Sequence, residues 1–191
     1  MDLSSSIAVV LCAGGSSRMG QPKGLLDWRD TPLLRAQILA FERQQIPVVV
    51  VLGAHEEAYR AVLTSNSKVV VNQRWRQTHL SDSLRLALRT ISPRRPTWVM
   101  PVDTPPVTPQ CLDLLWQAGP PAVPVDPLGK RGHPALIDIN IINHLCASEI
   151  PGGLRTLLGN ANTVAIDNQL VSMNFNTPLD WQLVADREAR S

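Results

Sequence analysis

Glycines and cations follow one another closely in residues 11–26, which read LCAGGSSRMGQPKGLL. Gly14 and Gly15 carry no side chain, so the backbone there can approach a ligand and turn its N–H groups toward it. Arg18 can bind a phosphate through two parallel hydrogen bonds, and Lys23 adds a mobile point charge. This combination predicts a cradle for a triphosphate. The alternative is a glycine-rich turn whose basic residues are only solvated.

Two common phosphate-binding loops do not fit this stretch. A Walker A loop has the pattern G-x-x-x-x-G-K-[ST], whereas here Gln21 and Pro22 separate the second glycine from Lys23. A dinucleotide fingerprint has the pattern G-x-G-x-x-G, and the glycines of this chain fall in a different register. The stretch therefore argues against a P-loop NTPase and against an NAD-type oxidoreductase.

The elements that must position this loop are indicated by the pattern of apolar residues. IAVVLC (7–12) directly precedes the glycines and is typical of a strand buried on both faces, as in a parallel sheet covered by helices. Similar runs predict strands at 47–52, 68–71 and 97–102, and shorter strands at 134–138 and 163–167. Amphipathic patterns predict helices over 31–45, 81–91, 108–119 and 176–189, with one more between the last two strands. This alternation predicts an α/β fold with a mostly parallel sheet.

Capping residues mark where several of these helices begin. Thr108 with Pro109 predicts one helix start, and Thr177 with Asp180 resembles a capping box at another. For the helix over 81–91, Ser81 or Ser83 is a candidate N-cap.

The bulk composition narrows the class of protein. The 191 residues suit one domain, 1–191, and the net charge of +2 is too small to indicate a nucleic-acid partner. Three widely spaced cysteines, Cys12, Cys111 and Cys146, have neither metal-ligand nor redox spacing and predict free thiols. No apolar run approaches the ~20 residues that span a bilayer, and the N-terminus lacks the basic start of a signal peptide. We expect a cytoplasmic protein with no membrane partner.

Six segments, in order along the chain, resemble one known family. Residues 11–26 resemble the signature L-x-A-G-x-S-x-R-M-G-x-x-K-x-L-L of the MobA-like NTP transferase superfamily. Further segments are similar to its later elements: NQRWRQTHLSDSLRLAL (72–88), PVDTPPVTP (101–109), GKRGHPALI (129–137), GGLRTLL (152–158) and NFNTPLD (174–180). Two residues separate Gly15 from Arg18, which is the spacing of molybdenum cofactor cytidylyltransferases.

The resemblance implies both a fold and a reaction. The fold is a three-layer Rossmann-like nucleotidyltransferase fold. The reaction is Mg²⁺-dependent transfer of CMP from CTP to molybdopterin or the molybdenum cofactor with release of pyrophosphate, and a molybdoenzyme or its chaperone is an expected partner. Two alternatives stay open: a guanylyl- or other nucleotidyltransferase acting on another small phosphorylated acceptor such as a sugar phosphate, and a non-catalytic nucleotide- or cofactor-binding protein.

The resemblance also implies a role for individual residues. The nucleotide would be bound by Leu11, Cys12, Ala13, Gly14, Gly15, Arg18, Lys23 and Asn72. The catalytic residues would be Arg18, Lys23 and Asp103, and the metal ligands Asp103 and Asn176. The acceptor would be bound by Ser81, Ser83, Arg131 and His133.

Several of these residues have a structural alternative. Asp103 can be a turn residue or a helix cap, the two serines can cap a helix, and His133 can orient the loop beside Pro134. The chain also departs from the family pattern in three places. Asn176 stands where the cytidylyltransferases often have a second metal-binding aspartate, and His79 replaces a usual glycine. The pair Gly152-Gly153 lacks the acidic residue that often precedes this glycine.

Overall fold

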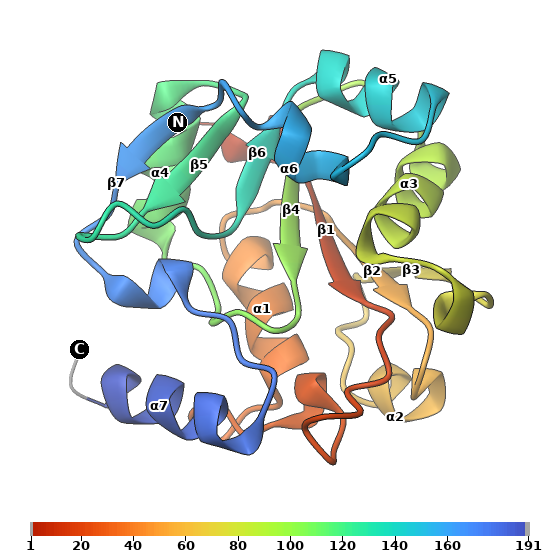
Figure 1. The fold of residues 1–191 in the computed structure, drawn as a ribbon, viewed down its shortest axis with the longest axis vertical. Coiled ribbons are helices and arrows are strands. Elements are labelled where there is room, and N and C mark those ends of the chain that lie inside the picture. Colours follow the sequence, from red (N-terminus) through yellow and green to blue (C-terminus); the bar gives the residue numbers. More distant parts are fainter. Residues whose placement is uncertain (1, 190–191) are drawn as a thin grey trace.

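The computed structural model describes residues 2–189, and one sheet of seven strands runs through this part of the chain (Figure 1). The spatial order of the strands is β3-β2-β1-β4-β6-β5-β7. In chain order they are β1 (Ile7–Cys12), β2 (Val48–Leu52), β3 (Lys68–Val71), β4 (Thr97–Pro101), β5 (Ala122–Val125), β6 (Ala135–Ile137) and β7 (Asn162–Ala165). Only β6 runs antiparallel to its neighbours, β4 and β5. The predicted α/β fold with a mostly parallel sheet is therefore confirmed.

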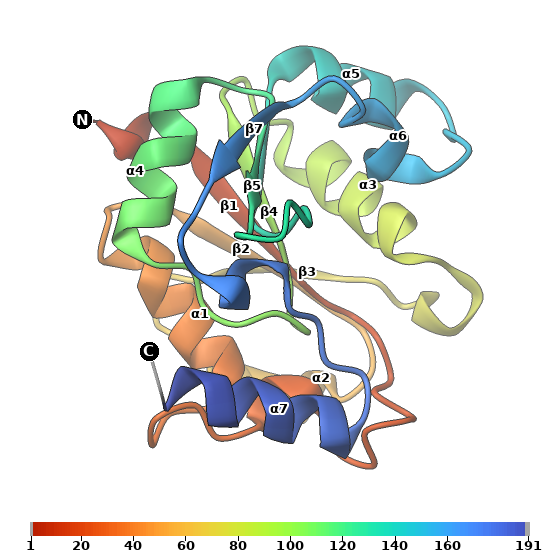
Figure 2. The same cartoon turned by 60° about the vertical axis from the view of Figure 1, so that its left-hand side comes forward.

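The helices cover both faces of this sheet (Figure 2). They are α1 (Leu33–Glu42), α2 (Glu56–Arg60), α3 (Leu80–Ile91), α4 (Pro109–Ala118), α5 (Ile139–Ala147), α6 (Gly153–Leu157) and α7 (Pro178–Glu188). Alternate side chains of β1 fill two separate cores, because successive side chains of a strand point to opposite faces. Ala8 and Val10 pack with α1 and α4, whereas Val9 and Leu11 pack with α3 and α5. The result is the expected three-layer arrangement.

One strand, β5, and two helices were not predicted. The helices are α2 and the second of the pair α5 and α6, which lie where one helix was expected between β6 and β7. β5 lies in the sequence PPAVPV, whose prolines argue against a strand. Its pairing with β7 in parallel register and with β6 supplies the support that the local sequence lacks. α2 is only one turn and a half long, too short to give a helical period.

The helix caps agree with the sequence in two places and differ in one. The Thr108 hydroxyl accepts a hydrogen bond from the N–H of Cys111, and the Thr177 hydroxyl accepts one from the N–H of Asp180, each at 3.2 Å. The prediction that Ser81 or Ser83 caps the helix over 81–91 is wrong. α3 begins at Leu80, and its N-cap is His79, whose N–H donates to the Asp82 carboxylate at 2.8 Å.

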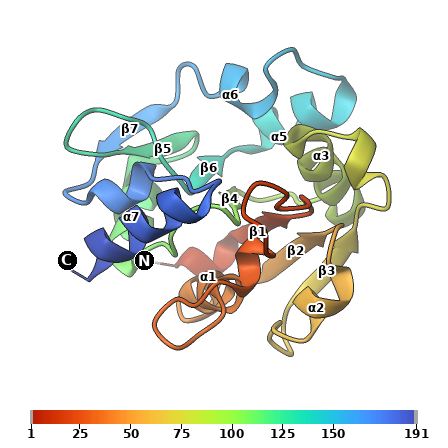
Figure 3. The same ribbon diagram turned by 60° about the horizontal axis from the view of Figure 1, so that its bottom comes forward.

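The loops that follow β1, β2 and β4 meet at the carboxyl edge of the sheet, the edge that Figure 3 brings forward. The N–H of Val102 donates to the carbonyl of Leu11, and the N–H of Ala54 donates to the carbonyl of Ala13, both at 3.0 Å. α7 packs against the segment after the glycines through Val184, which shares an apolar cluster with Met19 and Leu26. Within residues 2–189, no helix combines the length and the apolar character needed to cross a membrane.

Candidate active site

The glycine-rich loop follows β1, and its far end is held at Lys23. Gly14 is exposed, and a side chain added there would meet no atom within 4 Å. Ser16 has a positive φ of 52°, and its hydroxyl accepts the backbone N–H of Lys23 at 3.1 Å. This bond ties the two ends of the loop together. The backbone around Gly14 is therefore free to approach a ligand, as the sequence predicts.

Two cations of this loop converge with an amide and a carboxylate from distant segments. The Lys23 ammonium donates to the Asp103 carboxylate at 3.1 Å and to the Asn176 side-chain carbonyl at 3.0 Å. The Arg18 guanidinium donates to that same Asn176 oxygen at 2.9 Å. The Lys23 side chain is only 11% exposed and that of Asp103 24% exposed, so the ion pair is partly shielded from water. We call Arg18, Lys23, Asp103 and Asn176 the charged cluster; it carries a net charge of +1 with both cations protonated.

The capping box of α7 fixes Asn176 in this cluster. The N–H groups of Asn176 and Thr177 donate to the Asp180 carboxylate at 3.0 and 2.9 Å, and these bonds hold the pKa of Asp180 below its usual value. The neighbouring Phe175 is fully buried, and its N–H donates to the carbonyl of Asp103 at 3.0 Å. This bond joins the two segments that supply the oxygens of the cluster.

The oxygens of the charged cluster suit a divalent cation. The described residues contain no group of three or more histidine, cysteine, aspartate or glutamate side chains that could hold a metal by themselves. Asp103 and Asn176, however, direct two oxygens toward one cation, the Lys23 ammonium. Mg²⁺ is commonly bound by one or two carboxylates together with phosphate oxygens and water. The donor set therefore fits a metal that arrives with a phosphorylated ligand.

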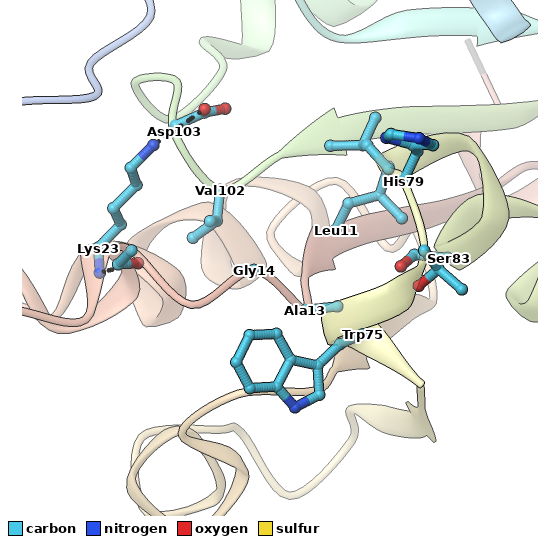
Figure 4. Close-up of a pocket in the computed structure, with 12 residues that line it drawn as sticks. Leu11, Ala13, Gly14, Lys23, Trp75, His79, Ser83, Val102 and Asp103 are labelled. Carbon is cyan, nitrogen blue, oxygen red and sulfur yellow. Dashed lines mark hydrogen bonds and ion pairs between the residues drawn. The ribbon is translucent and has the colours of Figure 1, made fainter. Parts of the chain in front are cut away.

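A pocket of about 150 Å³ extends from the charged cluster along the loop (Figure 4). It is lined by Leu11, Ala13, Gly14, Ser16, Lys23, Trp75, Thr78, His79, Leu80, Ser83, Val102 and Asp103. Figure 4 places Lys23 and Asp103 at one end and His79 with Ser83 at the other, with Leu11, Ala13 and Trp75 between them. The pocket thus has a charged end and an uncharged end with apolar walls.

Four of the residues expected to bind the nucleotide do not line this pocket. One is Arg18, whose guanidinium lies in the charged cluster. The Cys12 side chain is buried on the opposite face of the sheet, where burial raises the pKa of its thiol to about 12. Gly15 lies against the Trp75 indole, because a Cβ at this glycine would stand 2.9 Å from an indole carbon. Asn72 is buried behind the wall, where its amide contacts two of the lining residues.

The residues expected to bind an acceptor contact different parts of the protein. Ser83 lines the pocket described above, and the Ser81 side chain lies beside Gly153. The Arg131 guanidinium donates to the carbonyls of Leu158 and Gly159 at 2.8 and 3.2 Å. Their common role at one acceptor site stays a prediction.

His133 lines a second cavity, of about 510 Å³, between α1, α7 and the segment 105–109. Its Nδ1 is buried and has no hydrogen-bond partner in residues 2–189. This burial lowers the pKa of the imidazole, and the nearby Asp103 carboxylate opposes the change. Burial therefore favours the neutral form of this imidazole.

Sequence reasoning missed six lining residues of the pocket: Ser16, Trp75, Thr78, His79, Leu80 and Val102. Trp75 could have been found, because it is the tryptophan of the N-x-x-W element by which the segment 72–88 resembles the family. The Arg76 guanidinium also lies over this indole. Its central carbon is 4.9 Å from the ring centroid, a cation–π distance. Of the other five, His79 is marked only by its departure from the family pattern, and the remaining four have no chemical signal that separates them from ordinary loop and helix residues.

Comparison with known proteins gives a family that agrees with this geometry. The family model of the MobA-like NTP transferase domain matches residues 8–165, whereas no curated protein matches the sequence. Rv0371c from Mycobacterium tuberculosis has a similar structure, with 28% identity, a TM-score of 0.81 and coverage of 95% of this chain and 98% of that one.

Two further solved structures resemble the chain over nearly its whole length. Rv0371c in complex with manganese has 27% identity and a TM-score of 0.77, with coverage of 95% of this chain and 98% of that one. Molybdopterin-guanine dinucleotide biosynthesis protein A from Archaeoglobus fulgidus has 19% identity and a TM-score of 0.66, covers 96% and 99%, and shares the fold. The family match spans most of the chain and includes the glycine-rich loop and Asp103. The chain therefore belongs to the MobA-like NTP transferase family and is a nucleotidyltransferase of that family.

Proposed function

We propose that the chain transfers CMP from CTP to a molybdopterin-type cofactor and releases pyrophosphate, with Mg²⁺ as the metal. The observation that carries this proposal is the convergence of Lys23 and Arg18 on the oxygens of Asp103 and Asn176, at the end of a pocket walled by the glycine-rich loop. The choice of CTP and of the acceptor is supported by the spacing between Gly15 and Arg18 and by the six family-like segments. The manganese complex of Rv0371c supports the need for a divalent cation.

The residues of the site meet the needs of nucleotidyl transfer. A phosphate oxygen of the acceptor forms a bond to the α-phosphorus of the nucleotide, while the bond to pyrophosphate breaks. Positioning and neutralisation of negative charge are the main contributions that a protein makes to such a step. In this proposal the backbone near Gly14 lies along the phosphates, and Arg18 and Lys23 bind the departing pyrophosphate. Asp103 and Asn176 would hold Mg²⁺, which supplies further neutralisation of the phosphate charge.

Lys23 must change partners when a triphosphate binds. Its ammonium now occupies the position between the oxygens of Asp103 and Asn176. A phosphate oxygen is a stronger attraction for this ammonium than a neutral amide, so the triphosphate would draw Lys23 away from Asn176. The triphosphate competes in the same way for Arg18, which donates to the same Asn176 oxygen, so this oxygen would become available to the metal.

A pyrophosphate-release assay tests this proposal. The protein is incubated with Mg²⁺ and CTP, GTP, ATP or UTP in turn, with and without molybdenum cofactor. Release that requires both CTP and the cofactor supports the full proposal. Release with GTP, or only with a sugar phosphate as acceptor, assigns the chain to one of the sister reactions instead. The Asp103→Asn variant is the matched control, since it keeps the shape of the side chain and removes its charge.

A second candidate is a protein that binds the nucleotide or cofactor without catalysis, for example a carrier that serves a molybdoenzyme. The observation in its favour is Asn176, because an amide neutralises less metal charge than a carboxylate. This candidate predicts measurable CTP binding, no pyrophosphate release with any acceptor, and unchanged behaviour of Asp103→Asn.

A further inference from the structure

The turn after β2 and the short helix α2 lie against the glycine-rich loop. The N–H of Ala54 donates to the carbonyl of Ala13 at 3.0 Å. The two backbones are also in direct contact at Gly53, where an added Cβ would stand 2.6 Å from the carbonyl oxygen of Ala13. The segment 53–59 therefore supports the loop from the side of β2.

Two side chains of this segment extend the support to both ends of the loop. The ring Nε2 of His55 lies 3.2 Å from the carbonyl oxygen of Gly15. A carbonyl can only accept, so this ring nitrogen carries a proton and donates it. One helical turn later, the Tyr59 hydroxyl accepts the backbone N–H of Gly24 at 3.5 Å. His55 thus holds the loop near its start, and Tyr59 holds it near its end.

Tyr59 contacts the end of the loop by packing as well as by hydrogen bonding. Its side chain is fully buried, and a Cβ at Gly24 would stand 2.8 Å from a carbon of its ring. The Gly24 backbone therefore lies directly on the phenol ring. The Ser16 hydroxyl, which accepts the N–H of Lys23, also hydrogen-bonds to the Tyr59 side chain. Tyr59 consequently joins Ser16 to the backbone beside Lys23.

The backbone conformation of His55 indicates that its side chain has a use. Its φ is +58°, in the left-handed region that glycine adopts at the least cost. His55 is the N-cap of α2, yet its side chain makes no capping hydrogen bond. The imidazole instead reaches Gly15, and its ring meets that of Tyr59 edge to face, with the centroids 6.2 Å apart. Glycine would relieve the backbone at position 55 but would offer no donor to the loop.

The free energy of ligand binding explains why such support matters. A loop that becomes ordered only around a triphosphate loses conformational entropy on binding, and glycines make this loss larger. Contacts that hold the loop beforehand remove part of that loss. Gly14 lies between the two held positions, and a side chain added there would meet no atom within 4 Å. The loop is therefore fixed on the side of α2 and open where a ligand would bind.

We propose that His55 and Tyr59 are positioning residues that hold the glycine-rich loop at both ends in the conformation that binds a triphosphate. Neither side chain lines the pocket, so both act through the backbone of the loop, at Gly15 and Gly24. This inference rests on the proposed function only in taking a triphosphate as the ligand of the loop. It holds for whichever base and acceptor the protein uses.

Calorimetric titration of the full chain with inorganic tripolyphosphate, in the presence of Mg²⁺, tests this proposal. The probe carries the phosphates of a nucleotide without a base, so its affinity reports on the phosphate-binding loop. His55→Ala removes the donor to Gly15 and should weaken binding about tenfold. His55→Gln should restore most of the affinity, because its amide nitrogen is a donor near the position of Nε2. Both variants place a side chain in the same left-handed backbone, so their difference isolates the hydrogen bond.

The Tyr59→Phe variant tests the other end of the loop. It keeps the buried ring and removes the hydroxyl, and binding of tripolyphosphate should weaken roughly threefold to tenfold. Ser6→Ala is the matched control, because it also removes a fully buried hydroxyl, one that accepts the indole N–H of Trp98 at 2.8 Å. Ser6 precedes β1 and so lies at the end of this strand opposite to the loop. The control should lower the thermal midpoint but leave the affinity for tripolyphosphate unchanged.

Several outcomes would overturn the inference. They are an unchanged affinity in His55→Ala or in Tyr59→Phe, an equal loss in His55→Ala and His55→Gln, and an equal loss in the Ser6→Ala control. A wild-type protein that does not bind tripolyphosphate overturns it as well. The proposed function fails separately, if tripolyphosphate binding depends on His55 as expected but CTP yields no pyrophosphate. If Tyr59→Phe does not fold, the two variants of the exposed His55 still decide the question.

Discussion

The two ends of the pocket differ in how their polar groups are satisfied. At the charged end, Arg18, Lys23 and Asp103 bind one another and Asn176, partly within reach of water. At the uncharged end, the amide of Asn72 satisfies two hydroxyls in a buried network without a single formal charge. Charged side chains on flexible stems can exchange partners when a phosphate arrives, whereas a buried neutral network keeps one arrangement.

This difference predicts that the charged end of the pocket affects the rate of turnover and that the uncharged end affects which nucleotide is bound. Side chains that neutralise the charge of the phosphates should affect turnover strongly and should act equally on all nucleoside triphosphates. Groups with a fixed hydrogen-bond polarity should affect the choice of base and have a smaller effect on turnover. Mutations at the two ends should therefore give different patterns of kinetic change, and the following predictions test this contrast.

The largest effect is expected for Asp103→Asn. Loss of the carboxylate removes the single negative charge of the charged cluster and one proposed metal ligand. Turnover should fall at least ~10²-fold, as is typical for the loss of a group that stabilises charge in the transition state. Steady-state pyrophosphate release measures this, and the CTP-to-ATP ratio of binding should not change. A variant that keeps its turnover would remove Asp103 from the catalytic residues.

Lys23→Ala should reduce turnover by about 10²-fold and also weaken the binding of every nucleoside triphosphate. It has a second consequence, because the ammonium between Asp103 and Asn176 is lost. Mn²⁺ should then bind to the nucleotide-free protein more tightly than to the wild type, as measured by electron paramagnetic resonance of the free ion. Unchanged Mn²⁺ binding would mean that Lys23 does not compete with the metal.

The Asn176→Asp variant tests whether position 176, at the charged end of the pocket, belongs to the metal site. A second carboxylate beside Asp103 should tighten the binding of Mn²⁺ about tenfold, since ligand charge is a main determinant of affinity for hard cations. The same charge should weaken the binding of CTP in the absence of metal, because it pairs with Arg18 and Lys23 more strongly than the amide does. Calorimetric titration of each ligand alone separates the two effects. Equal metal affinity in both proteins would exclude position 176 from the metal site.

A smaller effect is expected for Gly15→Ala, at the wall between the two ends. Its new Cβ would lie 2.9 and 3.2 Å from two carbons of the Trp75 indole, so the indole must move. Because the contact is with the end of a side chain, the cost should be modest, and CTP and ATP should both bind roughly threefold to tenfold more weakly. Tryptophan fluorescence should report the displaced indole, and Trp75→Phe should relieve most of the loss.

The smallest effect concerns stability at acidic pH. Burial lowers the pKa of His133 in the folded protein below its ordinary value of 6.5. The unfolded chain then binds the proton more readily, so stability is fully present above pH ~6.5 and is lost as the pH falls toward the lowered pKa. The thermal midpoint of the wild type should therefore decrease below pH 6.5 more steeply than that of His133→Gln. Parallel curves for the two proteins would contradict this explanation.

Features that depend on neighbouring residues were predicted well. The apolar, β-branched run of β1, the glycines after it, and the caps at Thr108 and Thr177 are all local patterns with a direct physical meaning. Features that depend on partners elsewhere in the chain were not. β5 exists because β6 and β7 pair with it. The cap of α3 is a local feature that was nevertheless predicted wrongly: the N-cap is His79, whose N–H donates to the Asp82 carboxylate.

The sequence by itself determined the family, the mostly parallel sheet and the position of the glycine-rich loop, because these follow from periodicity, glycine spacing and the order of motifs along the chain. Only the tertiary structure decided which side chains meet. Lys23 and Asn176 are 153 residues apart, yet their contact defines the charged cluster. Asn72 was expected at the ligand and instead lies behind the wall, where its amide donates to the Ser83 hydroxyl. Such pairings depend on how β1, β4 and α3 pack together, and no local pattern in the sequence specifies them.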